Sequence, residues 1–305
     1  MKKIIKPRVE SIELVVYRIV KRRMVVSIEE SKHLTRLEKG FEGELLFDER
    51  IDKSSKEWLI LNDLQLKSNN TEFQIDSFLI TQKTIFLFEI KNYEGDYYIE
   101  GDKWYYTNGT EIQNPLTQLE RSEFLIRRLL QELGYSMPVE SFIIYINPDF
   151  HLYNAPRNLP IVYPTQLNRF FEKLNNIPTK VTEYHKRLAK KLISLHKDES
   201  TFTKLPKYSY EELQKGIMCV FCYSFDIIAI KRAVKCKSCD KIEDKTIAII
   251  RSVDEYVLLF PDRKITTNDI YEWCNGIVSK KSIQRILIKN FILKGNAKST
   301  YYIRK

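Results

Sequence analysis

Three ionisable side chains, Asp76, Glu89 and Lys91, stand where two short apolar runs begin and end. The runs, residues 75–80 and 85–90, are separated by four polar residues, a spacing that predicts a β-hairpin. The start of one strand of a hairpin lies opposite the end of the other, so the three side chains can meet at one end of a sheet. Charges at such a place are costly unless they pair or bind a metal ion.

This cluster suggests a magnesium site. Two carboxylates supply the hard oxygen ligands that Mg²⁺ prefers, and Lys91 could orient a water or stabilise charge on a phosphate. The other interpretation is a strand that reaches the surface at Glu89 and ends in an exposed Glu–Lys pair. This stretch alone does not distinguish the two.

The surrounding elements follow from periodicity, caps and turn residues. The second apolar run predicts a strand with one wholly apolar face and another that ends in Glu89 and Lys91. Asn114 and Pro115 open an amphipathic helix that Gly134 ends. The other expected helices cover about 41–53, 165–174, 179–197, 266–275 and 279–289, and the other expected strands 58–61, 97–100, 103–106, 139–146, 161–163, 291–294 and 300–304.

The order of helix, strands and helix carrying Glu44, Asp76, Glu89-Ile90-Lys91 and Gln118 resembles the restriction-endonuclease-like core with its Asp…(Asp/Glu)-x-Lys pattern. More narrowly, it resembles the nuclease-related domain (NERD) family over about residues 38–150. The matching segments are Gly43-Glu44, Gln74-Ile75-Asp76, Phe88-Glu89-Ile90-Lys91-Asn92-Tyr93-Glu94-Gly95, Trp104 and Asn114-Pro115-Leu116-Thr117-Gln118. Ser77 departs from the family, where a His after the Asp is frequent.

The resemblance implies phosphodiester hydrolysis with Mg²⁺ or Mn²⁺. Asp76 and Glu89 would be metal ligands, with the carbonyl of Ile90 as another. Glu44, from the first helix, would complete the set of ligands.

Two further residues gain roles from the same resemblance. Lys91 would assist the attacking water or stabilise the phosphorane, and Gln118 would point to the site from the start of the second helix. Taken singly, Gln118 and Glu44 would be ordinary exposed helix residues.

Four cysteines form a CxxC…CxxC pattern whose two halves are 13 residues apart: Cys219, Cys222, Cys236 and Cys239. Four thiolates on two tight turns suit tetrahedral Zn²⁺ without an open position, hence a structural site, and the segment looks like a zinc ribbon. Two disulfides are the competing interpretation, which conflicts with a reducing cytosol. Cys274 has no partner in the pattern and is expected to be a small buried side chain.

Residues 246–305 resemble a winged helix-turn-helix. Its second helix, 279–289, would turn basic side chains outward towards a major groove while the terminal hairpin contacts phosphates. The expected nucleic-acid-binding residues are Lys280, Lys281, Arg285, Lys289 and Lys298. The alternative is a helical cap that binds protein and carries a solvated charged face.

Charge and composition agree with a polyanion partner. The net charge is +10, of which residues 1–39 contribute +6 and residues 261–305 contribute +7, so the middle is slightly acidic. A generally basic proteome would explain the same balance. No apolar run approaches the ~18–20 residues of a membrane span, and residues 1–8 lack the features of a signal peptide, so a cytoplasmic protein without a membrane partner is expected.

These observations predict an α/β protein: a restriction-endonuclease-like mixed sheet flanked by helices, a small zinc ribbon and a C-terminal winged helix-turn-helix-like domain. The expected parts are a basic extension (1–36), a nuclease-like domain (37–175), a helical linker (176–215), the zinc ribbon (216–245) and the winged-helix-like domain (246–305). The expected function is metal-dependent hydrolysis of DNA. The rival is a non-catalytic nucleic-acid-binding adaptor that keeps the nuclease fold, and an RNA substrate also stays open.

Overall fold

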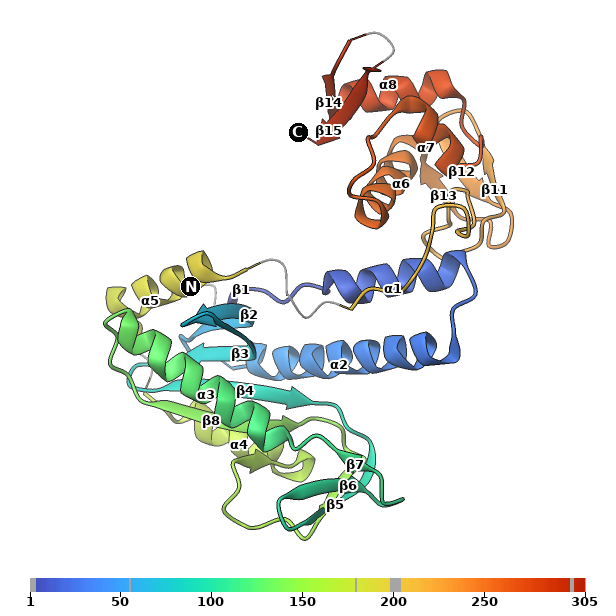
Figure 1. The fold of residues 1–305 in the computed structure, drawn as a ribbon. Coiled ribbons are helices and arrows are strands. Elements are labelled where there is room, and N and C mark those ends of the chain that lie inside the picture. Colours follow the sequence, from blue (N-terminus) through green and yellow to red (C-terminus); the bar gives the residue numbers. More distant parts are fainter. Residues whose placement is uncertain (1–3, 55, 179, 198–203, 297–298, 305) are drawn as a thin grey trace. The chain divides into compact units, whose positions relative to one another are not determined.

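The computed structural model describes residues 4–54, 56–178, 180–197, 204–296 and 299–304 (Figure 1). The chain divides into two compact units. Unit 1 comprises residues 1–11 and 35–203, and unit 2 comprises residues 12–34 and 204–305. Among the described residues, no helix has both the length and the apolar character needed to cross a membrane.

A six-stranded mixed sheet forms the centre of unit 1. Its strands, in spatial order, are β1 (Ile4–Lys6), β2 (Leu59–Ser68), β3 (Thr71–Ile80), β4 (Ile85–Lys91), β8 (Val139–Tyr145) and β10 (Ile161–Val162). β2, β3 and β4 are antiparallel neighbours, whereas β1, β8 and β10 each run parallel to the strand they join. The predicted hairpin is therefore two adjacent strands of this sheet.

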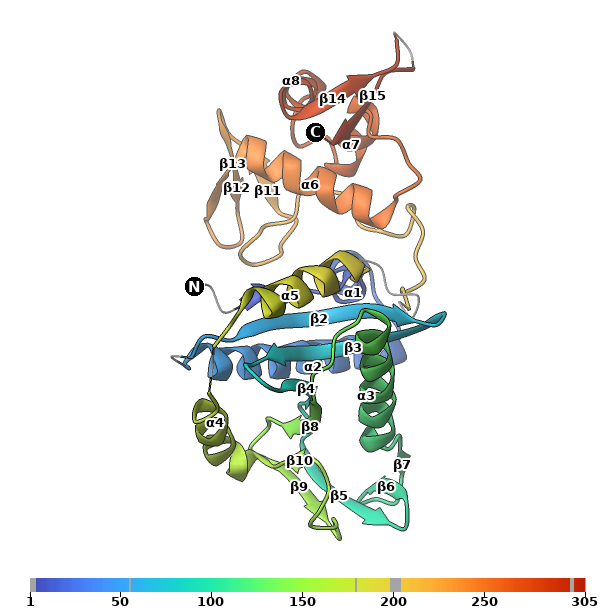
Figure 2. The same cartoon turned by 90° about the vertical axis from the view of Figure 1, so that its left-hand side faces the viewer.

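Helices cover both faces of the sheet (Figures 1 and 2). On one face α3 (Pro115–Glu132) and α5 (Glu183–Leu195) pack their leucines against Ile85 and Leu87. On the other, α2 (Ile28–Asp52) and α4 (Leu167–Asn175), which follows the short η1 (Pro164–Gln166), pack against Phe86 and Phe88. The alternation within one strand thus divides the core between two faces, which confirms the expected α/β layering.

A second, four-stranded sheet extends unit 1. It contains β7 (Glu111–Ile112), β6 (Lys103–Tyr106), β5 (Gly95–Glu100) and β9 (Phe150–Tyr153) in this order. β5 and β6 form the hairpin expected from Gly101, whose φ of +60° lies in the left-handed region. Because β5 follows β4 after three residues, this sheet continues directly from the end of the central hairpin.

Unit 2 combines an N-terminal helix with the C-terminal third of the chain. Its elements are α1 (Ile12–Arg23), β11 (Ile227–Ala229), β12 (Ala233–Cys236), β13 (Ile242–Asp244), α6 (Lys245–Leu259), α7 (Thr267–Trp273), α8 (Lys280–Asn290), β14 (Phe291–Lys294) and β15 (Tyr301–Arg304). Val16 and Val20 of α1 belong to the same apolar core as Val253 and Tyr256 of α6.

Two expectations about the first half of the chain are corrected. The segment 1–36 is not a separate extension, because residues 1–11 belong to unit 1 and residues 12–34 to unit 2. The helix expected over 41–53 begins at Ile28 and continues through Gly43. There a Cβ atom would lie 2.5 Å from the Cβ of Asn92, so this glycine permits close helix packing and does not end the helix.

The expected linker over 176–215 is also corrected. Its helix, α5, contributes Leu188 and Leu192 to the core of unit 1 and lies along β2. Apolar residues at helical spacing in a supposed linker are better explained by this packing.

Candidate active site

The central hairpin brings Asp76 next to Glu89. β3 pairs with β4 only from Ser77 to Ile80, so Asp76 stands where β3 leaves its partner strand. The N–H of Ile90 donates to Asp76 Oδ2 at 2.8 Å. Within a strand the N–H and C=O of one residue point to the same side, so the carbonyl of Ile90 also faces the place that β3 vacates.

Glu89, Lys91 and Gln118 form a hydrogen-bonded row beside Asp76. The ammonium of Lys91 donates to Glu89 Oε1 at 2.7 Å and to Gln118 Oε1 at 3.1 Å. Gln118 reaches this place because the Asn114 side chain caps α3 by accepting from the N–H of Leu116. The sequence analysis predicted that these residues would lie together, and the structure brings them together.

Glu44 lies on the other side of Asp76 and is held by a residue that the sequence analysis did not select. Nη1 of Arg8 donates to Glu44 Oε2 at 2.9 Å, and its Nε donates to Asp48 Oδ2 at 3.1 Å. Its Nη2 donates to the main-chain oxygen of Asp76 at 2.8 Å. The one available signal was the spacing of Glu44 and Asp48, which places two carboxylates on one helix face and calls for a cation.

Burial of these charges shifts their proton affinities. Burial, reinforced by Asp76, raises the pKa of Glu89 to about 7, and the same two causes raise the pKa of Glu44 to about 8 although Arg8 opposes them. Burial also raises the pKa of Asp76. Burial alone would lower the pKa of Lys91, but Glu89 and Asp76 raise it above its ordinary value, so Lys91 stays protonated.

A divalent ion fits this donor set. Glu89 is 1% exposed, and its Oε2 is a buried oxygen without a partner among the described residues. Glu44, Asp76 and Glu89 do not form a tight three-carboxylate group, because among the described residues only the cysteines bring three or more potential ligand atoms within 4.8 Å. A site with two carboxylates and open positions suits Mg²⁺, which usually keeps several of its waters.

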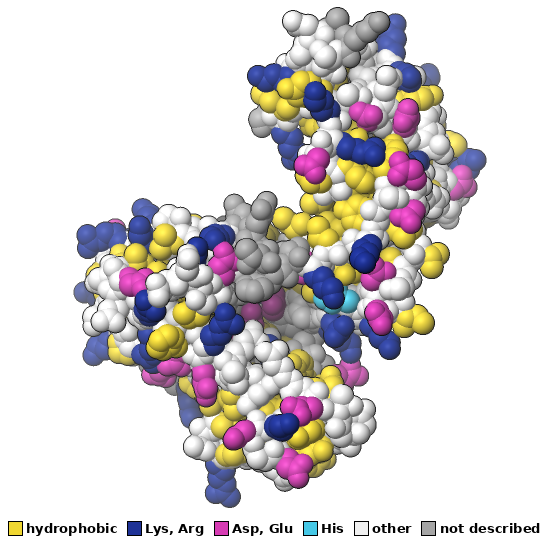
Figure 3. All heavy atoms as spheres, viewed as in Figure 1, with side chains coloured by type: hydrophobic (Ala, Val, Ile, Leu, Met, Phe, Trp, Pro, Cys, Tyr) yellow, Lys and Arg dark blue, Asp and Glu magenta, His cyan; other side chains and the backbone are white. Residues whose placement is uncertain are grey.

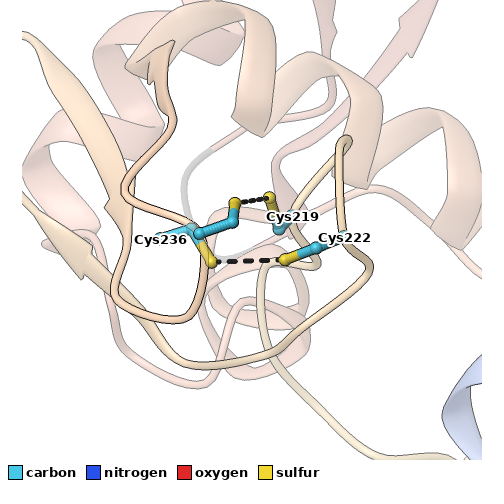
Figure 4. A group of neighbouring side chains, drawn as sticks. Cys219, Cys222 and Cys236 are labelled. Atoms are coloured by element: carbon cyan, nitrogen blue, oxygen red, sulfur yellow. Dashed lines mark hydrogen bonds between the residues drawn. The ribbon is translucent and has the colours of Figure 1, made fainter.

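The four predicted cysteines converge in unit 2 (Figure 4). Sγ of Cys219 lies 3.7 Å from Sγ of Cys239, and Sγ of Cys222 lies 3.6 Å from Sγ of Cys236. Ligands at the ~2.3 Å of a tetrahedral zinc–sulfur site are about 3.8 Å apart, whereas a disulfide requires about 2.05 Å. All four are free thiols, so the disulfide alternative is wrong and the cluster could hold zinc. Cys274, the fifth cysteine, is buried as expected.

The expected nucleic-acid-binding residues lie on α8, apart from Lys298, which is outside the described residues. Ser279 caps this helix, which buries Ile283 and Leu287. Its exposed basic residues are Lys280, Lys281, Arg285 and Lys289. The antiparallel pair β14–β15 follows directly, and a bridge from Ile265 to Tyr302 adds a third short strand.

The comparison with known families bears on this geometry. Residues 39–146 match the family model of the nuclease-related domain, NERD. This part of the chain is a nuclease-related domain. The match confirms the resemblance expected over residues 38–150, and the NERD segment contains every candidate residue of the unit 1 site except Arg8.

Other comparisons add little. One solved structure, the small subunit of the heterodimeric restriction endonuclease R.BspD6I, is 12% identical and covers 60% of this chain and 86% of its own, with a TM-score of 0.21. No curated protein matches the chain.

Proposed function

We propose that the protein is a divalent-metal-dependent nuclease that hydrolyses phosphodiester bonds of DNA. The observation that carries the proposal is the unpartnered, buried oxygen of Glu89 beside Asp76, at the position where a nuclease-related domain combines carboxylates with a lysine. A buried carboxylate oxygen without a partner is costly in a protein that has no ion to give it.

In this proposal Asp76 and Glu89 hold Mg²⁺ or Mn²⁺, and the carbonyl of Ile90 is a further ligand. Glu44 adds a carboxylate from α2 with the oxygen that Arg8 does not hold. When bound, the ion lowers the pKa of a water and neutralises charge that develops on the phosphate.

Lys91 and Gln118 act on the reacting groups through position and charge. Because Lys91 stays protonated between Glu89 and Gln118, it would hold the attacking water or stabilise the phosphorane by donating hydrogen bonds. Gln118 accepts from Lys91 and so fixes the direction of the ammonium, which would make it a positioning residue.

Unit 2 would help to hold the substrate. We propose that its four thiolates bind a structural Zn²⁺, and that α8 with the β14–β15 wing forms a winged helix that binds DNA. The exposed cations of α8 support this role, because phosphate contacts supply most of the non-specific affinity of such modules. In the view of Figure 3, Lys and Arg side chains are scattered among acidic ones and do not gather in one patch. Free thiols suit the reducing cytoplasm, which we propose as the location.

The direct test is a nuclease assay on single- and double-stranded DNA and RNA, with Mg²⁺, with Mn²⁺ and with EDTA. We expect Mg²⁺-dependent cleavage of DNA, and Glu89→Gln and Lys91→Met should each lower the rate at least about 100-fold. DNA binding should persist in both variants.

Glu111→Gln is a matched control, since it removes a carboxylate from an exposed Glu–Lys pair with Lys103 in the same unit. It should leave the rate unchanged. Equal cleavage by the wild type and both site variants would indicate a contaminating nuclease and refute the proposal.

The rival function is a non-catalytic adaptor that binds nucleic acid. It is favoured by the pairing of Glu89 with Lys91 and of Glu44 with Arg8, which balances much of the charge without an ion. Calorimetry with Mn²⁺ distinguishes the two functions. An adaptor would bind DNA with a steep salt dependence and take up no ion besides zinc.

A further inference from the structure

We propose that Arg8 is a built-in cation that occupies the place of a second divalent ion, so that the site in unit 1 binds one metal ion and not two. The proposal rests on the metal-dependent function argued above. Its evidence is the set of groups that a single guanidinium contacts.

Arg8 is surrounded by oxygen atoms of the kind that bind hard cations. Its side chain is 2% exposed, and it contacts carboxylate oxygens of Glu44 and Asp48 and the main-chain oxygen of Asp76. Carboxylates and main-chain carbonyls are the usual ligands of divalent ions in proteins. The guanidinium cannot deprotonate under ordinary conditions, so it is a permanent positive charge at this place.

The two helical carboxylates lack another described cation that could replace Arg8. Glu44 and Asp48 are four residues apart on α2 and therefore share one face of that helix. Among their printed ion pairs, both contact Arg8 alone. Without Arg8, three converging oxygen donors would be left with no counter-charge, which is the condition for an added cation site.

The charge balance also favours one ion. Asp76, Glu89, Glu44 and Asp48 face two fixed cations, Arg8 and Lys91. One divalent ion brings these ionised groups to neutrality, whereas two ions would leave two excess positive charges in a largely buried place.

One further carboxylate and one further cation lie nearby and do not alter this count. Asp63 is close enough to raise the pKa of Asp76 and of Glu44, and the Lys6 ammonium donates to the main-chain oxygens of Asn62 and Asp63. Their charges cancel.

The test counts Mn²⁺ bound to the zinc-loaded full chain, by calorimetry and by the electron-paramagnetic-resonance signal of free Mn²⁺. We expect one ion per wild-type chain and two per Arg8→Met chain. The second ion should disappear in Arg8→Met/Asp48→Asn. Arg50→Met removes an exposed arginine from the same helix and should still bind one ion.

The outcomes separate this proposal from the function beneath it. A wild type that binds no Mn²⁺ would overturn the metal-dependent function itself. A wild type that cleaves DNA and binds two ions, or a folded Arg8→Met that binds one, would overturn only the role of Arg8. If Arg8→Met does not fold, Asp48→Asn decides: the ion count should stay at one with affinity within about twofold, and loss of an ion would overturn the proposal.

Discussion

At the scale of single residues, the decisive feature is a carboxylate that is buried and only half satisfied. Lys91 binds one oxygen of Glu89, and the other oxygen has no partner among the described residues. Desolvation therefore disfavours the ionised form, and the neighbouring Asp76 adds to this effect. An ion at this place would relieve both costs together, so metal binding and proton release should be linked.

This linkage predicts how stability changes with pH. The pKa of Glu89 is raised from 4.5 to about 7 in the folded protein, so the folded state holds this proton more tightly than the unfolded state. Its contribution to the free energy of unfolding is therefore greatest below about pH 4.5 and falls as pH rises through 7. Mn²⁺ should reverse the fall, because it binds the ionised form.

The measurement is the melting temperature of unit 1 between pH 5 and pH 8, with and without Mn²⁺, compared with Glu89→Gln. The variant lacks the titrating group, so its curve should be flatter and Mn²⁺ should have less effect on it. A wild type that gains stability relative to Glu89→Gln as pH rises, without metal, would contradict the assignment.

At the scale of elements, helix α1 is joined to unit 2 by a buried ion pair. Nε and Nη2 of Arg23 donate to the two carboxylate oxygens of Glu255 at 2.7 and 2.8 Å. The guanidinium also lies 4.1 Å from the ring centre of Trp273 and donates to the carbonyls of Gln214 and Gly216. Every donor direction of this arginine is directed at unit 2, which explains why residues 12–34 belong to it.

Removing one partner of this pair should be costly. We expect Arg23→Met to lower the free energy of unfolding of unit 2 by about 3–5 kcal/mol, because Glu255 would be left buried without its counter-charge. Arg23→Met/Glu255→Gln should recover part of this loss. Urea unfolding followed by the fluorescence of Trp273 measures it in chains whose other tryptophans are replaced.

Lys21→Met is the matched control, since Lys21 is an exposed cation on the same helix, and it should change stability by less than about 0.5 kcal/mol. Equal effects of Lys21→Met and Arg23→Met would show that the buried pair does not hold α1 in place.

At the scale of the whole molecule, the two units have separate apolar cores. The cores of unit 1 lie on the two faces of its main sheet, and the core of unit 2 includes Cys219 and Cys236 together with α1 and α6. A zinc ion at the cysteines would therefore stabilise only the unit that contains them, because metal binding and folding are coupled locally.

Removal of zinc should accordingly act on one unit. We expect Cys222→Ser, or chelation at pH 7, to lower the melting temperature of unit 2 by many degrees and to leave that of unit 1 unchanged once Mg²⁺ is restored. Calorimetry of the full chain would record this as a shift in one of two transitions. A common shift of both, or no shift in either, would refute the proposed zinc site.

The sequence by itself determined the features that depend on local rules. Alternation predicted the two-faced strand that ends in Glu89 and Lys91, the Asn114-Pro115 cap predicted the start of α3, and the spacing of the cysteines predicted their convergence. Each of these depends on residues close together in the chain, where side-chain direction follows from secondary structure.

Only the tertiary structure decided where the first third of the chain belongs. Arg8 contacts a carboxylate 36 residues away, and Arg23 contacts one 232 residues away. Such pairs leave no periodic pattern, because their partners meet only when the sheet and helices have packed. For the same reason Gly43 suggested the end of a helix from the sequence, whereas close packing against Asn92 makes it part of α2.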